Sequence, residues 1–203
     1  MTAIPEFGDD PFAAFLEWFA SAKSTEPSDA NAFSLATATA DGRPSARIVL
    51  MKGLDEIGTL DRGFVFFTNI QSRKGDELRE NAKAAMLFHW KSQCRQLRIE
   101  GQVRPTTDAE ADSYFVTRPR VSRLGAWASQ QSRRLIARSV LEARLAEMEA
   151  KYPHDDIPRP PHWGGYRLVP ARFEFWQDMP FRLHDRTVYT RETGEWSRSK
   201  LYP

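Results

Sequence analysis

Residues 33–52 carry the pattern of a β-hairpin. The segment 33–40 alternates in character along the chain, Asp41-Gly42 is a turn signal, and 45–52 returns to strand-forming residues. Further strand-like segments follow at residues 63–69, 84–90, 96–104, 173–176 and 187–191. These strands come in runs, without the β-α-β alternation and GxGxxG turn of a Rossmann domain. We therefore predict an α+β fold with mainly antiparallel strands in a closed or partly closed barrel.

Helices are expected at the periphery of this barrel. Asp10-Pro11 is a helix start, and the apolar residues that follow it have the spacing of one helical face, which predicts a helix that covers the core. The other helical patterns lie at residues 72–81, 107–117 and 132–151, and a proline-rich loop lies at 158–161.

The length of the chain predicts one domain over residues 1–203. A chain of 203 residues, 41% of them hydrophobic, can bury one core. Residues 160–203 are too few to fold alone, so we expect them to complete the core or an interface.

Charge and cysteine content exclude several classes of protein. The net charge of +2 is too small to require a polyanionic partner, although a pI near 8.8 is compatible with anionic small ligands and with nucleic acid. Cys94 is the single cysteine and the histidines are scattered, so we expect neither a disulfide nor a metal site. The acidic start of the chain and the lack of a long apolar run predict a cytoplasmic protein.

Two cations stand where a helix start disfavours them. Ser72 is a candidate N-cap after a strand, and Arg73 and Lys74 fall in the first turn, where the helix dipole favours acids. A bound phosphate would explain this choice, because it would lie between the cations and the free backbone N–H groups. The alternative is that both cations point to solvent.

A second cationic stretch runs from residue 113 to 141. It contains no acid, its aromatic residues could cover a flat ring, and its six arginines are suited to phosphate esters. Arginines and aromatic residues would also be suited to binding nucleic acid. A further alternative is an arginine-rich helix surface without a ligand. The arginines are Arg118, Arg120, Arg123, Arg133, Arg134 and Arg138.

A third set of cations occurs near the C-terminus. Arg182, His184 and Arg186 alternate in sequence, so in a strand they would share one face. Such a face would favour an anion, because the flanking arginines disfavour a protonated histidine unless a negative charge is present.

Several motifs occur together and in one order, and they resemble the pyridoxine/pyridoxamine 5'-phosphate oxidase family from about residue 33 to residue 203. The motifs are Arg47-Ile-Val-Leu-Met-Lys52, Phe66-Phe-Thr-Asn69, Ser72-Arg-Lys74, Arg118-Pro-Arg120, Gly125-Ala-Trp127, Trp163-Gly-Gly-Tyr166, Phe173-Glu-Phe-Trp-Gln177 and Arg182-Leu-His-Asp-Arg186.

The resemblance implies a split β-barrel that binds FMN at the interface of a homodimer, with residues 160–203 contributing to the core and the dimer interface. It implies that Arg47, Arg73, Lys74 and Ser132 hold the phosphate and ribityl part of FMN. The full set of flavin contacts that it implies is Arg47, Ile48, Val49, Leu50, Met51, Lys52, Phe67, Thr68, Ser72, Arg73, Lys74, Gln96, Gln131, Ser132, Trp176 and Arg186.

The implied reaction is the oxidation of pyridoxamine 5'-phosphate or pyridoxine 5'-phosphate to pyridoxal 5'-phosphate by O2, with H2O2 as the second product. Arg182 and His184 would act on the pyridine ring, with Arg182 stabilising charge as hydride leaves. The implied substrate contacts are Lys52, Tyr114, Arg118, Ser122, Arg182, Leu183 and His184.

Three departures from the family pattern are visible. Phe67 stands where many members have tyrosine, Lys200 replaces an arginine, and the N-terminal arm is short and lacks arginines.

One competing function is a related FMN oxidase that acts on another metabolite, as in phenazine biosynthesis. The other is a non-catalytic nucleic-acid-binding module built on residues 113–141, which would bind polyanions in a strongly salt-dependent way.

Overall fold

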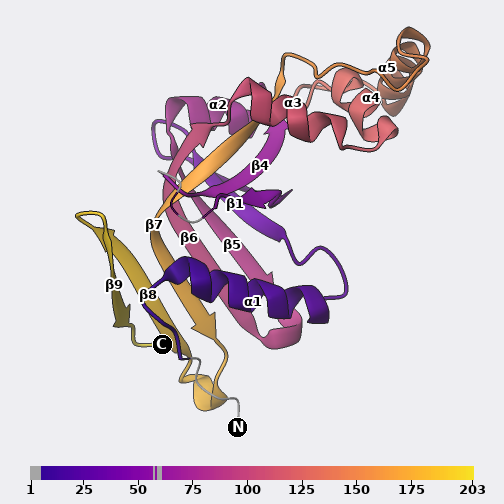
Figure 1. The fold of residues 1–203 in the computed structure, drawn as a ribbon. Coiled ribbons are helices and arrows are strands. Elements are labelled where there is room, and N and C mark those ends of the chain that lie inside the picture. Colours follow the sequence, from indigo (N-terminus) through magenta and orange to yellow (C-terminus); the bar gives the residue numbers. More distant parts are fainter. Residues whose placement is uncertain (1–5, 57, 59–60) are drawn as a thin grey trace.

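The computed structural model describes residues 6–56, 58 and 61–203, which form a curled antiparallel sheet with helices around it (Figure 1). The strands of this described part are β1 (Ala32–Ala38), β2 (Pro44–Leu50), β3 (Gly53–Leu54), β4 (Phe64–Asn69), β5 (Lys83–Trp90), β6 (Arg95–Pro105), β7 (Trp163–Gln177), β8 (Asp185–Glu192) and β9 (Glu195–Lys200). Its helices are α1 (Pro11–Thr25), α2 (Arg73–Glu80), α3 (Asp108–Val116), α4 (Arg120–Ala128), α5 (Arg138–Lys151) and the short 3-10 turns η1 (Lys91–Gln93) and η2 (Pro180–Arg182).

The sheet is ordered β2-β1-β5-β6-β7-β4-β3, and β8 and β9 extend it from β7. Each described pair of strands is antiparallel. Because the sheet curls on itself and the helices stay outside it, the predicted α+β class with a partly closed barrel is confirmed.

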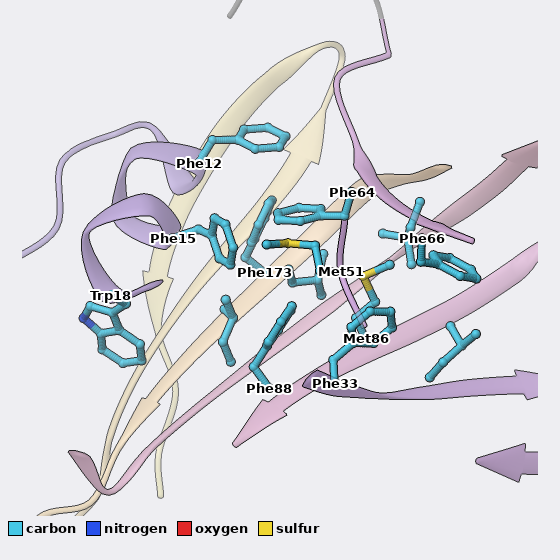
Figure 2. Packing of buried hydrophobic residues seen from close by; sticks show 14 of the residues in the cluster. Phe12, Phe15, Trp18, Phe33, Met51, Phe64, Phe66, Met86, Phe88 and Phe173 are labelled. Atoms are coloured by element: carbon cyan, nitrogen blue, oxygen red, sulfur yellow. The ribbon is translucent and has the colours of Figure 1, made fainter. Parts of the chain in front are cut away.

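The core lies between α1 and the concave side of the sheet. The Asp10 carboxylate accepts a hydrogen bond of 2.9 Å from the Phe12 N–H, which begins α1 as predicted. Figure 2 shows Phe15 of this helix directed at Phe173 of the sheet, and Trp18 of the same helix packs edge to face on Phe175 at 5.2 Å between centroids. The Phe15 and Phe64 rings meet edge to face at 4.9 Å between centroids. Burial of one such phenylalanine stabilises the fold by about 1.5–3 kcal/mol.

Strand β7 joins the two ends of the sheet. Its first six residues pair with β4 and its last six pair with β8, while β6 runs along most of its length. The β6–β7 register shifts between Glu100 and Gly101. Glycine is required at this bulge, since a Cβ at position 101 would overlap the backbone oxygen of Val169.

A second, smaller core lies at one end of the sheet, where α3, α4 and α5 gather (Figure 1). It is formed by Ala111, Phe115, Leu124, Ile157 and Trp163. Thr107 caps α3 with a capping box in which Glu110 is the reciprocal partner. This end of the fold holds the helices that border the cavity described below.

The elements differ from prediction in five respects. The helix predicted at 132–151 begins only at Arg138, because Ser132 turns with a φ of 69° and the backbone of Ala137 is extended. Helix α4 and strand β9 were not predicted, and β7 is much longer than the predicted 173–176. The prediction that Arg182 shares a strand face with His184 and Arg186 was wrong, since β8 begins only at Asp185.

Candidate functional site

A cavity of about 570 Å³ opens between the β1–β2 hairpin, β4 and the helices α3 and α4. The hairpin contributes the C-terminal half of β2, β4 contributes its C-terminal end, and α2 contributes its first turn. The cavity is lined by Arg47, Ile48, Val49, Leu50, Lys52, Phe67, Thr68, Lys74, Tyr114, Thr117, Arg118, Pro119, Ser122, Gln131 and Trp163. Twelve of these fifteen residues were predicted from the sequence, and the remaining three are Thr117, Pro119 and Trp163.

Lys74 is a buried cation at the wall of this cavity. Its Nζ donates hydrogen bonds to Thr68 Oγ1 at 3.0 Å, to Ser72 Oγ at 3.1 Å and to Gln131 Oε1 at 2.7 Å. Burial and, to a smaller extent, the charge of Arg47 together lower the pKa of Lys74 to about 8, against the opposing effect of Glu77. The alternative in which both first-turn cations point to solvent is therefore wrong for Lys74.

Glu77 connects the cations of this region. Its side chain is 3% exposed and accepts hydrogen bonds from Arg47 Nη2 at 3.2 Å and from Arg73 Nε at 2.9 Å. Burial raises the pKa of Glu77, but hydrogen bonds from Ser45, Thr37 and Arg73 outweigh it and bring the pKa to about 2. Sequence reasoning missed Glu77, although its position four residues after Arg73 is the spacing of a helical ion pair.

Arg118 is a half-buried cation of the cavity. Its Nη1 is buried and has no hydrogen-bond partner among the described residues. The guanidinium lies 5.0 Å from the Trp163 ring centroid and 5.6 Å from that of Phe115. Burial lowers the pKa of Arg118, against a raising effect of Tyr114. A buried guanidinium N–H without a partner is costly, so the geometry favours an anionic or hydrogen-bond-accepting ligand at this point.

Three aromatic rings form a parallel stack in the wall of the cavity. Phe67 and Tyr114 lie 4.3 Å apart at 8°, and Phe67 and Trp163 lie 5.3 Å apart at 2°. Gly165 allows this stack, because a Cβ there would lie 2.6 Å from the Phe67 ring. The arrangement fixes Tyr114 beside Arg118 at the point where α3 ends.

A second group of predicted site residues, here called the distal group, lies on β6, on β7, on β8 and at the residue just before β8. It consists of Gln96, Trp176, His184 and Arg186. Trp176 pairs with Gln96 on one side and with Arg186 on the other, and its ring lies 4.6 Å from that of His184. Arg186 donates to the buried Glu174 through Nε at 3.0 Å and Nη2 at 2.7 Å. His184 Nδ1 lies 2.9 Å from Asp178 Oδ1.

A single chain does not bring the distal group to the cavity. Thr68 pairs with Gly164, at the start of β7, whereas Gln96 pairs with Trp176, near its end. The two pairings lie about a dozen residues apart on one strand, on the order of 40 Å at ~3.3 Å per residue. Figure 1 shows the turn that precedes β8 at the opposite end of the sheet from α2 and α3.

Arg182 belongs to an exposed turn. Phe181 and Arg182 both have left-handed backbone conformations, with φ of 59° and 61°, and they follow Pro180. Phe181 and Leu183 are 92% and 68% exposed. The turn therefore presents Arg182 and two apolar side chains outward, and a strained backbone of this kind is typical of functional loops.

The arginines of residues 113–141 do not form one anion-binding surface. Arg120 donates to the backbone oxygens of His154 and Tyr152, and Arg123 pairs with Asp155, so both tie α4 to the loop after α5. Arg133 contacts Gln71 O and Asp76, and Arg138 pairs with Glu142. Arg118 alone of the six lines the cavity.

Besides Arg73, three other predicted residues lie beside the cavity without lining it. The Met51 side chain is in the main core (Figure 2), and Ser72 is buried with its hydroxyl donating to Asn69 O at 2.7 Å. Ser132 is exposed in the turn after Gln131. Ser72 is the N-cap of α2 as predicted, although its side chain makes no capping bond.

In residues 6–56, 58 and 61–203, no helix is long and apolar enough to span a bilayer. The same residues contain no group of three His, Cys, Asp or Glu side chains placed to hold a metal ion.

Comparison with known proteins covers nearly the whole chain. The family model described as pyridoxamine 5'-phosphate oxidase matches residues 21–152, and the one described as the pyridoxine 5'-phosphate oxidase C-terminal dimerisation region matches residues 163–203. A pyridoxine/pyridoxamine 5'-phosphate oxidase of Granulibacter bethesdensis is 58% identical over 96% of this chain and 92% of its own. One from Gluconobacter oxydans is 55% identical over 100% of both chains.

Solved structures share the fold. The crystal structure of PhzG from Burkholderia lata 383, in complex with tetrahydrophenazine-1-carboxylic acid, matches with a TM-score of 0.91 and 35% identity. The match covers 100% of this chain and 98% of that one. An FMN-binding protein from Nostoc punctiforme, related to pyridoxamine 5'-phosphate oxidase, has a TM-score of 0.76 at 18% identity and covers 97% of this chain.

Proposed function

Because the chain belongs to the pyridoxamine 5'-phosphate oxidase family, we propose that it oxidises pyridoxamine 5'-phosphate or pyridoxine 5'-phosphate to pyridoxal 5'-phosphate with O2 as electron acceptor. Curated relatives of this name are 55–58% identical over nearly the full chain. The observation that carries the proposal is the buried Nη1 of Arg118, which has no partner among the described residues and belongs to a side chain that lines a cavity with the size and charge for a small phosphate ester.

The cofactor in this proposal is FMN, and the residues present fit it. Arg47, Arg73 and Lys74, here called the cationic cluster, converge near the N-terminus of α2, and Lys74 is held buried with a depressed pKa. A phosphate at this point would favour the protonated, charged form of Lys74 and would accept hydrogen bonds from the backbone N–H groups in the first turn of α2. Phe67, Thr68 and Gln131 would contact the rest of the flavin from the cavity wall.

The substrate phosphate would lie at the other side of the cavity. Arg118, Tyr114 and Ser122 come from α3, α4 and the loop between them, and Lys52 reaches the same cavity from the end of the hairpin. Arg118 would donate its free Nη1 to a phosphate oxygen, which satisfies the buried donor. The aromatic stack holds Tyr114 in place for the same ligand.

The mechanism rests mainly on positioning. The chemistry that FMN supplies when bound is acceptance of a hydride from the C4' carbon of the substrate and reduction of O2 to H2O2. Lys52 and Arg118 would fix the substrate phosphate, so that the reacting carbon is held in one place. Arg182 and His184 would contact the pyridine ring, with Arg182 stabilising charge there as the substrate is oxidised.

The active form in this proposal is a homodimer. The C-terminal match is to a dimerisation region, and the distal group cannot reach the cavity of its own chain. Two-fold pairing would bring the distal group of one chain, with Arg182 and Leu183, to the cavity of the other, so that each site draws on both chains. Residues 160–203 would then complete both the core, through β7 and β8, and the interface.

A visible spectrum of the purified protein, followed by anaerobic addition of substrate, tests the proposal. We expect a flavin spectrum that bleaches on addition of pyridoxamine 5'-phosphate and far less with pyridoxamine, which lacks the phosphate. Bleaching only by a reduced phenazine carboxylate would assign the protein to the chemistry suggested by the Burkholderia lata relative. A colourless protein that binds polyanions with a steep salt dependence would favour the nucleic-acid alternative.

A further inference from the structure

We infer that Glu77 is a positioning residue that aims Arg47 and Arg73 at the phosphate of the flavin. The inference rests on the proposed function, because it takes the cationic cluster as the site of that phosphate. Glu77 lies one turn after the start of α2, beside the cavity and not in its lining. Its role would therefore be exerted through the two arginines.

Glu77 links elements that are distant in the sequence. From α2, its carboxylate accepts from Thr37 Oγ1 of β1 at 2.5 Å and from Ser45 Oγ of β2 at 2.6 and 2.9 Å. Arg47, two residues after Ser45 on β2, donates to the same carboxylate at 3.2 Å. The contact thus fixes the outer end of the hairpin against the helix that begins with Arg73 and Lys74.

The two arginines share this one carboxylate. Arg73 Nε donates to Oε1 at 2.9 Å, whereas Arg47 Nη2 donates to Oε2. The Arg73 side chain is 59% exposed, and among the described residues Glu77 is its only hydrogen-bonding side-chain partner. Arg47 is also held by Leu35 O at 3.0 Å. Glu77 therefore matters most for the direction of Arg73.

The charge of Glu77 suits the proposed ligand. Three cations lie in the cluster, and one buried carboxylate reduces their sum to two positive charges, which match a phosphate monoester dianion. The hydrogen bonds that hold the pKa of Glu77 at about 2 keep it ionised at neutral pH. An ionised carboxylate can accept all four donors, whereas an amide at this position would offer one oxygen and turn its NH2 group toward donors.

The test compares FMN with riboflavin, which lacks the phosphate, on apo-protein by flavin fluorescence. We expect Glu77→Gln to weaken FMN binding by about tenfold or more and to change riboflavin binding by less than about twofold. Glu80→Gln, on the same helix and exposed, removes the same charge and should change neither. Glu77→Asp keeps the charge but shortens the reach, so it should also weaken FMN selectively, and it serves if the glutamine variant does not fold.

Other results would overturn the inference. If Glu77→Gln binds FMN as tightly as the wild type or more tightly, Glu77 only lowers the charge of the cluster. Equal loss of FMN and riboflavin binding would show that Glu77 supports the fold alone. If the wild-type protein binds FMN no better than riboflavin, the proposed phosphate site fails and the inference fails with it.

Discussion

Lys74 shows how one buried side chain can make ligand binding depend on pH. Its amino group is surrounded by oxygen atoms of Thr68, Ser72 and Gln131, none of which carries a charge. These hydrogen bonds do not compensate for burial, and the pKa falls from 10.5 to about 8. Between these two values the unfolded chain binds more protons, so through Lys74 the ligand-free protein gains stability as the pH rises across this window.

The affinity for FMN should change in the opposite direction. Phosphate binding favours the charged form of Lys74, so above pH 8 binding requires uptake of a proton. We expect the affinity for FMN to be nearly constant between pH 7 and pH 8 and to fall by up to about tenfold per pH unit above pH 8. Titration of apo-protein with FMN from pH 6.5 to 9.5 measures this.

The matched control is Lys74→Arg, because a guanidinium stays charged throughout this range. Its FMN affinity should be independent of pH even if it is lower overall. A wild-type profile that stays flat to pH 9.5 would show that Lys74 does not face the phosphate.

At the scale of elements, the turn that carries Arg182 is separate from the strand that carries Arg186. Lys52 and Arg118 line the cavity and already supply charges for the substrate phosphate, whereas Arg182 lies on the turn. Arg182 is therefore better suited to a role on the reacting ring than to a role on the phosphate. We expect Arg182→Leu to retain FMN and to slow flavin reduction in single-turnover stopped flow by roughly tenfold or more, with a smaller change in substrate affinity.

Arg118→Leu should show the reverse balance, with weaker substrate binding and a smaller effect on the rate at saturation. If Arg182→Leu is reduced at the wild-type rate once saturated with pyridoxamine 5'-phosphate, Arg182 only binds the substrate.

The bulge at Gly101 should be sensitive to a single methyl group. Gly101→Ala would force a Cβ into the Val169 carbonyl, and the strands would have to separate there. We expect a loss of about 1–3 kcal/mol, seen as a melting temperature lower by several degrees at fixed protein concentration. Gly125→Ala on α4, where nothing lies within 4 Å of the new Cβ, should be neutral or slightly stabilising. Equal melting temperatures for the two variants would contradict this account.

Local patterns predicted the elements whose cause is local. The hairpin and α1 follow from turn residues, capping and periodicity within about fifteen residues, and both were confirmed. Helix α4 was missed because Pro119 caps it without a side-chain bond and because it has only nine residues, with an arginine, Arg123, among its buried positions. The alternation of Arg182, His184 and Arg186 was misleading, since Pro180 and two left-handed residues form a turn there.

The candidate site could be predicted only in part, because some of its contacts join residues that are distant in the sequence. The family resemblance named most residues of the cavity, because its motifs include them. Glu77 was missed because its partners Thr37 and Ser45 are 40 and 32 residues away, and no local pattern reports such a contact. Trp163 was part of a recognised motif, but its place in the aromatic stack depends on the pairing of β4 with β7.

At the scale of the whole molecule, division of the site between two chains can be tested by complementation. Arg118→Leu damages the cavity, and Arg182→Leu damages the turn near the distal group. In a dimer that contains one chain of each kind, one site receives both defects and the other receives none. After unfolding and refolding an equal mixture, about a quarter of the sites should be intact, because half of the dimers are mixed.

Measured at a substrate concentration well below the wild-type KM, where Arg118→Leu is also impaired, activity of the refolded mixture should therefore approach about a quarter of the wild-type value, well above either variant refolded alone. The same mixture without unfolding is the control for exchange of subunits. If the mixture is no more active than the average of the two variants, each site is built from one chain.

The course of β4 and β7 has a consequence for synthesis on the ribosome. Strand β4 emerges early, but its long partner begins about a hundred residues later, and until then only the two-residue β3 pairs with it. A nascent chain that has reached residue 160 therefore exposes the edges of both β4 and β6, together with the phenylalanines that face the core. We therefore expect the sheet to close only after β7 has been synthesised, and a chain truncated near residue 160 to be prone to aggregation.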